Sequence, residues 1–339
     1  MSDTVTIPLD ELDSIVQGIF ARSGLTPQQA KSVADVIIAG ERDGCKSHGI
    51  YRIEGCLKTI RDGKVVADAV PELVDDGSGV IRVNANGAFS NPAFETGLDA
   101  LVERAKKLGV AALAINDCTH FSALWPEIEM LTDRGLAGMA MCPSYSAVAP
   151  AGGSQPTMGT NPFAFGWPRK DAPPFVFDFA TSVAARGEIE LHRRAGTKIP
   201  EGWAVDKDGK PTTDPNAALE GAMLPFGSYK GSAISIMIEL LAAAMIGDMI
   251  SPEALDYLHG SFDYAPIHGE LILAFDLDHF SKGRPGNPLD RAEALFDQIT
   301  GQGARLPSQR RFAARKVSLS EGVTLTRAEM DGLKALAAQ

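Results

Sequence analysis

The chain has 339 residues, of which 45% are hydrophobic and 22% charged, a composition typical of a globular protein with roughly two or three structural units. The formal net charge of −11 disfavours a nucleic-acid partner, because a phosphate-binding surface needs clustered Lys and Arg. The first residues lack the basic and apolar regions of a signal peptide, and no apolar run is long enough to span a bilayer, so we expect a cytoplasmic location.

The cysteines contain no C-x-x-C pair: they stand at Cys45, Cys56, Cys118 and Cys142. This spacing predicts neither a zinc site nor a disulfide framework. Free thiols are typical of a reducing compartment. We therefore expect no bound metal.

The N-terminal part is predicted to be helical. Apolar residues recur at helical spacing from Leu9 to Ile19. Thr26 and Pro27 predict the cap and first turn of a second helix, which runs to Gly44. A third helix is expected from 48 to 62.

The middle of the chain mixes strands and helices. We predict strands at 80–83, 110–115, 136–141, 163–167, 175–178 and 270–276. We predict helices at 91–108, 126–134, 182–194 and 230–245, the last of them buried. The stretch 196–228 is rich in Gly, Pro and Asp and is predicted to be an extended loop. The tail, 290–339, is predicted to be helical, with Leu306 and Pro307 breaking it.

Helices at both ends with strands between them predict an α+β fold and not a doubly wound one; that the central sheet is mostly antiparallel is what the family resemblance described below implies. We divide the chain into a helical unit of 1–70 with 280–339, a mixed segment at 71–119, and a central sheet unit at 120–279. The dinucleotide fingerprint G-x-G-x-x-G is missing. The nearest match, at 301–306, lacks the third glycine and follows no convincing strand, so a Rossmann turn is excluded.

The first candidate site is the segment around His48. A histidine at the start of a helix lies near positive backbone dipoles, which lowers its pKa and prepares it for proton transfer. Arg52 follows four residues later on the same helical face, and its guanidinium can hold a carboxylate with two hydrogen bonds. The alternative is a capping histidine and a surface arginine.

Three further segments have the composition of ligand-binding loops. The stretch 120–124 follows an apolar strand, and loops after strands often build sites. Residues 159–162 allow the backbone to approach a ligand closely. Asp178 ends a strand, where it can accept hydrogen bonds from ribose or amide groups, and Glu188 can orient His48. The alternatives are ordinary turns, helix capping by Asp178, and a solvated Glu188.

Two basic segments are candidate phosphate sites. Lys230 stands at a glycine-flanked helix start, which suits a phosphate. The segment 305–311 offers several donors, and a 2′-phosphate would explain its two adjacent arginines, Arg310 and Arg311. The alternatives are a polar helix entry and a basic helix start.

The ordered set of these segments resembles the malate/L-lactate dehydrogenase family of the non-Rossmann type over essentially the whole chain. The stretches 47–49, 120–127, 185–194 and 306–311 resemble one branch, the Δ1-piperideine-2-carboxylate/Δ1-pyrroline-2-carboxylate reductases. Other branches usually carry Gly at the position of Ser122, and aromatic or small residues where Leu124 and Trp125 stand, so the imine branch is favoured.

The resemblance implies a homodimer that binds NADPH, with NADH as a weaker cofactor. It implies that His48 donates the proton, with Ser47 and Glu188 as relay partners. Four residues then bind substrate: Arg52, Thr160, Arg186 and Gly187. The cofactor is then bound by His120, Phe121, Ser122, Ala123, Leu124, Asp178, Phe179, Ala180, Tyr229, Lys230, Ala304, Arg305, Leu306, Pro307, Ser308, Gln309 and Arg310.

The implied reaction is NADPH-dependent reduction of Δ1-pyrroline-2-carboxylate to L-proline, or of Δ1-piperideine-2-carboxylate to L-pipecolate. A 2-hydroxy acid dehydrogenase of the same family, acting on lactate, malate or ureidoglycolate, is the nearest alternative. A hydrolase with a triad of Ser47, His48 and Glu188 is disfavoured, because sequence neighbours do not face each other on a helix. A non-enzymatic binding protein is the remaining alternative.

Overall fold

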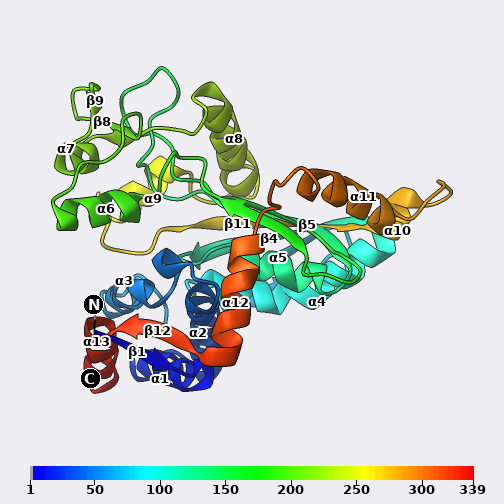
Figure 1. Cartoon of the computed structure of the whole chain (residues 1–339), viewed down its shortest axis with the longest axis horizontal. Helices are drawn as coiled ribbons and strands as arrows, with labels where there is room; N and C mark the ends of the chain where they lie inside the picture. The colour runs from blue at the N-terminus through cyan, green and yellow to red at the C-terminus, as the bar shows by residue number, and fades with distance from the viewer. Residues whose placement is uncertain (1–2) are drawn as a thin grey trace.

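A seven-stranded sheet forms the centre of the computed structural model, which describes residues 3–339 (Figure 1). The strand order is β2-β3-β4-β11-β5-β6-β7. The strands are β2 (Glu72–Val74), β3 (Val80–Asn84), β4 (Val110–Thr119), β5 (Leu136–Met141), β6 (Phe163–Trp167), β7 (Phe175–Phe179) and β11 (Ile267–Asp276). Only β3 and β4 pair in parallel within this sheet; the other neighbours are antiparallel. The predicted α+β fold with a mostly antiparallel sheet is confirmed.

Helices cover both faces of this sheet. On one face lie α4 (Ser90–Leu108) and α5 (Trp125–Thr132), which bury Leu98, Leu101 and Ile128 against the strands. On the other face lie α8 (Tyr229–Glu239) and the π-helical turn η3 (Leu240–Ala244), with Ile238 and Ala242 packed against the sheet. β11 therefore lies between two apolar layers, as its run of buried residues requires.

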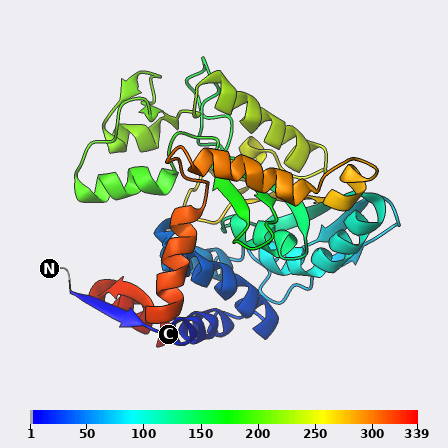
Figure 2. The same ribbon diagram turned by 45° about the vertical axis from the view of Figure 1, so that its right-hand side comes forward.

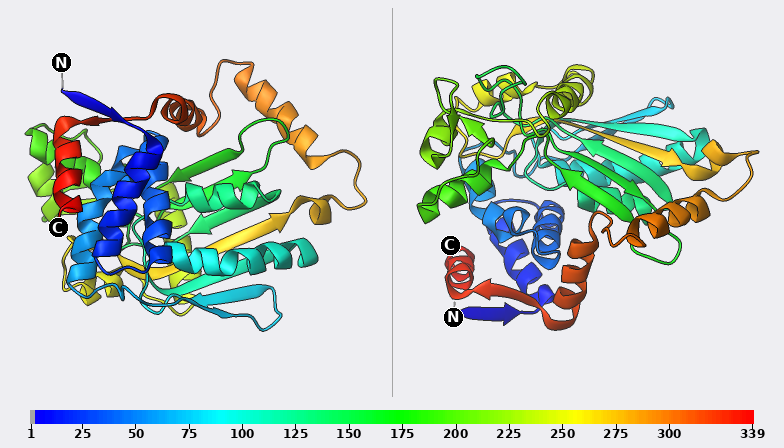
Figure 3. Two further views of the ribbon diagram at one scale, coloured as in Figure 1. Left: turned by 90° about the horizontal axis from the view of Figure 1, so that it is seen from below. Right: turned by 45° about the horizontal axis from the view of Figure 1, so that its top comes forward.

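The N-terminal helices and the C-terminus form one helical unit. It contains α1 (Leu9–Arg22), α2 (Pro27–Arg42), the 3₁₀ turns η1 (Lys46–His48) and η2 (Ile50–Arg52), α3 (Ile53–Arg61) and α13 (Arg327–Ala337). A two-stranded ladder of β1 (Thr4–Ile7) and β12 (Val323–Thr326) joins the ends of the chain (Figure 3). The shared core includes Leu12, Phe20, Ile37, Leu325 and Leu333. Neither of the two strands was predicted.

A third group of elements lies at one end of the central sheet, apart from the N-terminal helices (Figure 1). It comprises α6 (Arg186–Ala195), β8 (Ala204–Val205), β9 (Pro211–Thr212), α7 (Pro215–Glu220), β10 (Ala222–Met223) and α9 (Ser251–Tyr257). The prediction of an extended loop over 196–228 was therefore wrong, because short strands and a capped helix organise it around a small apolar core. The predicted helix at 182–194 begins later, at Arg186.

The helix predicted at 230–245 is present, but the prediction that it is buried holds for one face only. It forms as α8 and η3, and its outer face leaves Ile236, Leu240 and Met245 46%, 59% and 61% exposed. Only one face meets the sheet.

The tail passes from the sheet back to the helical unit (Figure 2). After α10 (Leu277–Ser281), α11 (Pro288–Thr300) packs on the edge of the sheet, where Phe296 stacks on Phe175 with ring centres 5.3 Å apart. α12 (Gln309–Glu321) then runs toward the helical unit. The predicted break at 306–307 is confirmed, while β12 interrupts what was predicted as helix. The borders of the three predicted units stay a prediction.

Within residues 3–339, no helix is both apolar enough and long enough to cross a membrane.

Candidate functional site

The turn that carries His48 is held against α2 by two glycines and a buried acid. A Cβ added to Gly40 would lie 2.5 Å from the carbonyl oxygen of His48. A Cβ added to Gly49 would collide with the carboxylate of Glu41. Glu41 is buried, and its Oε1 accepts the backbone N–H of Ile50 at 2.9 Å. Only glycine permits this approach at both positions, so the sequence itself fixes where the His48 turn lies.

The predicted helix at 48–62 was wrong at its start. Gly49 adopts φ −92° and ψ −143°, which separates η1 from η2, and the α-helix α3 begins only at Ile53. His48 therefore ends a 3₁₀ turn and does not open an α-helix. Its pKa is lowered to about 3 as expected in direction, but the causes are burial and then the electrostatic effects of Arg52 and His120, not a helix dipole.

The imidazole of His48 has two defined neighbours. Its Nδ1 lies 3.1 Å from Ser47 Oγ, within hydrogen-bond distance. The edge of its ring meets Trp125, with ring centres 6.0 Å apart and an angle of 76° between the planes. Because Ser47 engages Nδ1, Nε2 is the nitrogen left to exchange a proton with a bound molecule.

The structure joins Ser47 to His48 but does not bring Glu188 into the same hydrogen-bonded group. Glu188 lies exposed in the first turn of α6, and within residues 3–339 it forms no hydrogen bond to either residue. The relay role of Glu188 stays a prediction.

The charges of two guanidinium groups, those of Arg52 and Arg186, act on the hydroxyl group of Tyr145. Arg52 Nε donates to the Ser47 carbonyl at 2.8 Å, which fixes the side chain and leaves its terminal amino groups for an anion. Arg186 lies over the ring of Phe262 at 3.8 Å, and Phe262 packs edge-on against Tyr145 with ring centres 4.9 Å apart. Burial raises the pKa of Tyr145, while the charges of Arg52 and Arg186 act on it in the lowering direction.

Tyr145 was missed from the sequence. Its only signal there was an aromatic side chain in a Gly- and Pro-rich stretch. The tertiary structure alone brings it within the electrostatic influence of two arginines that are 134 residues apart along the chain.

The other predicted substrate residues lie beside this group. A Cβ added to Gly187 would touch the Tyr51 hydroxyl at 3.8 Å, so the start of α6 meets the His48 turn. A Cβ added to Gly159 would lie 2.7 Å from the backbone nitrogen of Ser144, which puts Thr160 next to the segment that carries Tyr145.

The loop at 120–124 is anchored along its whole length. The backbone N–H of His120 donates to the Pro266 carbonyl at 2.9 Å. Asn91 donates to the Ser122 hydroxyl at 3.1 Å. Asp178 Oδ2 accepts the N–H groups of Leu124 and Trp125 at 2.8 and 3.1 Å. Burial raises the pKa of the Asp178 carboxyl, although these N–H groups and the charges of Arg311 and His120 oppose the rise.

Asp178 therefore does what the alternative interpretation proposed: it holds the N-terminal end of α5. Through it, the predicted cofactor segments 120–124 and 178–180 are joined directly. The side chains of Phe121, Ala123 and Leu124 are buried, whereas Phe179 is 41% exposed and Ala180 is half-buried.

The remaining predicted cofactor segments converge on the same edge of the sheet. A Cβ added to Gly231 would lie 3.0 Å from the Thr181 carbonyl, so the start of α8, with exposed Tyr229 and Lys230, lies beside β7. The Ser308 hydroxyl donates to the Val176 carbonyl on β7. The Leu306 N–H donates to Gln309 Oε1 at 3.1 Å. Ala304, Arg305, Pro307 and Arg310 are exposed.

The two adjacent arginines are not equivalent. Arg311 is only 8% exposed and pairs with Asp43 and Glu129, with Asp43 Oδ2 at 3.0 Å. The interpretation of both arginines as phosphate ligands was therefore wrong for Arg311, because its guanidinium is already engaged by buried carboxylates. Arg310, Arg305 and Lys230 remain exposed, and none of them forms an ion pair within residues 3–339.

Comparisons with known proteins agree on one family of relatives. The family model described as malate/L-lactate dehydrogenase matches residues 7–334. A Δ1-pyrroline-2-carboxylate reductase of Agrobacterium fabrum is 68% identical over 337 residues, covering 99% of this chain and 97% of the relative. A Δ1-pyrroline-2-carboxylate/Δ1-piperideine-2-carboxylate reductase of Pseudomonas aeruginosa is 54% identical, covering 96% and 97%.

The solved structures agree. A Δ1-piperideine-2-carboxylate reductase from Pseudomonas syringae pvar. tomato superimposes with a TM-score of 0.93 at 40% identity, covering 98% of this chain and 99% of that one. A match over nearly the whole length, in sequence and in fold, leaves one conclusion: the chain belongs to the malate/L-lactate dehydrogenase family.

Proposed function

We propose that this protein reduces cyclic imine carboxylates, Δ1-pyrroline-2-carboxylate and Δ1-piperideine-2-carboxylate, to L-proline and L-pipecolate. The similar proteins named for these substrates support the proposal. The observation that carries it is an acid–base group held in one turn with an anion-binding group: the Ser47 hydroxyl engages His48 Nδ1, the Ser47 carbonyl fixes Arg52, and the charges of Arg52 and Arg186 both act on Tyr145. A small carboxylate with a protonatable nitrogen matches this set.

The described residues fit a nicotinamide dinucleotide. Loop 120–124, the end of β7, the start of α8 and segment 304–310 adjoin one another through Asp178, Ser308 and Gly231. Lys230, Arg305 and Arg310 supply exposed cations for phosphate groups. When bound, the dinucleotide supplies the hydride that reduces substrate C2.

The protein's own groups then position the substrate and move one proton. Arg52, together with Thr160, binds the substrate carboxylate through the amino groups that the Ser47 carbonyl leaves free. The imidazolium form of His48 gives its Nε2 proton to the ring nitrogen as C2 accepts the hydride and is left as neutral imidazole, so the C=N bond becomes a C–N bond with one hydrogen added to each atom. Binding a carboxylate next to Arg52 also neutralises one of the charges that lower the pKa of His48.

We propose NADPH as the preferred cofactor and NADH as a weaker one, on the basis of exposed Arg305 and Arg310. Replacing both with alanine should raise the KM for NADPH much more than the KM for NADH. An equal effect on both cofactors would remove this basis for the preference.

The deciding experiment follows oxidation of each cofactor with four substrates in parallel: Δ1-pyrroline-2-carboxylate, Δ1-piperideine-2-carboxylate, pyruvate and oxaloacetate. We expect kcat/KM for the two imines to exceed that for the keto acids at least about a hundredfold, about 2.7 kcal/mol of transition-state discrimination. Preference for a keto acid would instead support a 2-hydroxy acid dehydrogenase, the function in the name of a neighbour from E. coli that is 26% identical.

The homodimer expected from the family resemblance is part of this proposal. Leu240 and Met245 on the outer face of η3 and the following turn offer apolar surface for a second copy. Light scattering coupled to size exclusion measures the molar mass directly. The cytoplasmic location expected from the sequence stays a prediction.

A further inference from the structure

The turn at 159–161, which carries the predicted substrate residue Thr160, is held by polar side chains that have no role so far. Asn161 is fully buried, and its φ of 36° lies in the left-handed region that residues other than glycine rarely adopt. A Cβ added to Gly159 would lie 2.4 Å from Asn161 Oδ1, so the turn is tight as well. Such a conformation costs free energy and persists only where its surroundings hold it.

The end of α8 holds Asn161. Its Nδ2 lies within hydrogen-bond distance of three acceptors there: the Ser235 carbonyl oxygen at 3.2 Å, Ser235 Oγ at 2.9 Å and Glu239 Oε1 at 2.8 Å. Ser235 is fully buried and Glu239 is half-buried. The side-chain amide of Asn161 is therefore fixed, and with it the backbone on the C-terminal side of Thr160.

Glu239 also holds the other side of the turn, through Ser251 at the start of α9. Ser251 Oγ accepts the N–H of Gly159 at 2.9 Å and donates to Glu239 Oε1. The second oxygen of Glu239, Oε2, accepts the N–H of Ser251 at 2.9 Å. One carboxylate thus holds both neighbours of Thr160, Asn161 directly and Gly159 through a fully buried serine.

Thr160 keeps its own hydroxyl free within this arrangement. Its carbonyl oxygen accepts the backbone N–H of Thr181 at 2.8 Å and the Thr181 hydroxyl at 3.0 Å. Within residues 3–339, the Thr160 hydroxyl forms no hydrogen bond, and the residue is only half-buried. The backbone is fixed while one donor remains for a ligand, and a carboxylate accepts such a donor.

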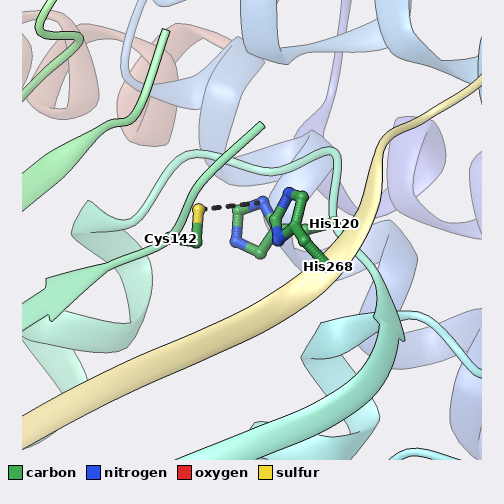
Figure 4. A group of neighbouring side chains, drawn as sticks. All are labelled: His120, Cys142 and His268. Carbon is green, nitrogen blue, oxygen red and sulfur yellow. Dashed lines mark hydrogen bonds between the residues drawn. The ribbon is translucent and has the colours of Figure 1, made fainter. Parts of the chain in front are cut away.

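The turn packs on the segment that follows β5, and this segment is itself supported by a buried group. Figure 4 shows the first residue of the segment, Cys142, with its sulfur facing the ring of His120, 3.8 Å from Nδ1. The ring of His268 lies beside that of His120, and Glu270 Oε2 lies 3.7 Å from His120 Nε2. None of these four side chains is more than 4% exposed. Because a buried, close-packed group resists displacement, the segment is a rigid support for the turn.

We propose that Glu239 is a positioning residue that sets the Thr160 hydroxyl against the substrate carboxylate. It acts through Asn161 and Ser251 and does not itself touch the substrate. The inference rests on the proposed function only in that Thr160 binds a 2-carboxylate, a group that cyclic imines and keto acids share. The alternative is that Glu239 stabilises the fold and nothing more.

Three variants separate these two roles. Glu239→Met keeps the length of the side chain and removes both acceptor oxygens, so we expect the KM for the substrate to rise about tenfold, as for one lost charge-assisted hydrogen bond. The KM for the cofactor should stay within about twofold. Glu239→Gln keeps an oxygen for Asn161 and should hold the substrate KM within about threefold. The control is Glu253→Met: this exposed acid on α9 accepts the N–H of Ile250 at 3.0 Å and forms no hydrogen bond with the turn, so its substrate KM should not change.

A double-mutant cycle tests whether Glu239 acts through Thr160. Thr160→Val removes the hydroxyl and keeps the branched side chain, so in that background Glu239→Met should raise the substrate KM less than about twofold. The same rise in both backgrounds would identify a structural role and overturn the proposal. An unchanged KM in Glu239→Met, or an equal rise in Glu253→Met, would overturn it too.

Ser251→Ala keeps the proposal testable if Glu239→Met does not fold. It removes the hydroxyl that joins Gly159 to Glu239 and should raise the substrate KM about threefold, an effect that must again disappear in Thr160→Val; an unchanged KM would refute the link. Failure of the proposed function shows separately, as a preference for pyruvate or oxaloacetate, and the same KM comparisons then run with that keto acid. An unchanged KM in Thr160→Val alone would overturn this inference and leave the imine preference standing.

Discussion

The guanidinium of Arg311 lies over the indole of Trp125, 4.9 Å from the ring centre. Trp125 also meets the imidazole of His48, and Arg311 pairs with Asp43 after α2 and with Glu129 on α5. One residue of the C-terminal helix α12 therefore supports two other helices and the residue that packs on His48.

Arg311→Met should destabilise the protein, because it leaves two buried carboxylates with fewer partners. Breaking a buried ion pair costs about 3–5 kcal/mol, and since Arg315 still pairs with both acids we expect about 2–3 kcal/mol here. Urea unfolding measures the loss. Exposed Arg194, paired with Glu190 on α6, is the control, and Arg194→Met should change stability by less than about 0.5 kcal/mol. Equal losses of unfolding free energy in the two variants would contradict a stabilising role for the buried ion pairs of Arg311.

His48→Ala should lower kcat by about 10²- to 10⁴-fold, the usual contribution of a positioned proton donor. The dissociation constant for NADPH, followed by tryptophan fluorescence, should stay within about twofold of its original value. Ser47→Ala keeps the imidazole and removes only its Nδ1 partner, so its effect on kcat should be smaller. Near-normal turnover in His48→Ala would exclude this residue as the donor.

Arg52→Ala should raise the KM for the imine about 10- to 100-fold and leave the KM for the cofactor unchanged, since a charge-assisted hydrogen bond contributes about 1.5–3 kcal/mol. Arg193, an exposed arginine on α6 that pairs with Glu190, provides the comparison. Initial rates of Arg193→Ala should match the original protein. An unchanged KM in Arg52→Ala would show that the substrate carboxylate binds elsewhere.

Gly49→Ala should reduce turnover without unfolding the protein. The new methyl group would collide with the Glu41 carboxylate and push the His48 turn away from α2. Gly55, in α3, has open space where a Cβ would stand, so Gly55→Ala should keep full activity and raise stability by about 0.5–1 kcal/mol. Paired measurements of kcat and Tm check both variants, and full activity in Gly49→Ala would argue against this constraint.

His268 predicts a loss of stability on acidification. Its pKa is about 3 in the folded chain against 6.5 ordinarily, so below pH 6.5 the unfolded chain binds a proton that the folded chain does not. Stability must therefore fall as the pH falls through that window, by about 1 kcal/mol for this residue between pH 7.5 and 5.5. Urea unfolding at both pH values should show a smaller fall in His268→Gln. Exposed His259→Gln should retain the original fall.

The sequence predicted the elements whose signals are local. Strands β5 and β6 lie at the predicted positions, because each is a short apolar run with turn residues nearby. β1 and β12 escaped prediction because each forms only by pairing with a partner more than 300 residues away. The break at Gly49 depends likewise on Glu41 and Gly40 of another helix.

The same distinction holds for the site. His48, Arg52 and loop 120–124 have recognisable residue types at recognisable spacing, and the structure places them near Trp125 and Tyr145. The position of Glu270 near the site could not be predicted, because a single acidic residue in an apolar strand has no distinctive sequence pattern. Whether Arg310 or Arg311 is free could not be read from two identical neighbours, since the distinction is made by Asp43 and Glu129.

The pairing of β1 with β12 constrains the order in which the chain folds during its synthesis. Thr4 pairs with Thr326, so the first strand leaves the ribosome long before its partner exists. At about 5–20 residues per second, that interval is roughly 15 to 65 s. During this time α1 lacks the cover that β12 and α13 later provide, and the N-terminal helices must associate with one another first. Final closure of the helical unit is therefore a late, post-translational event.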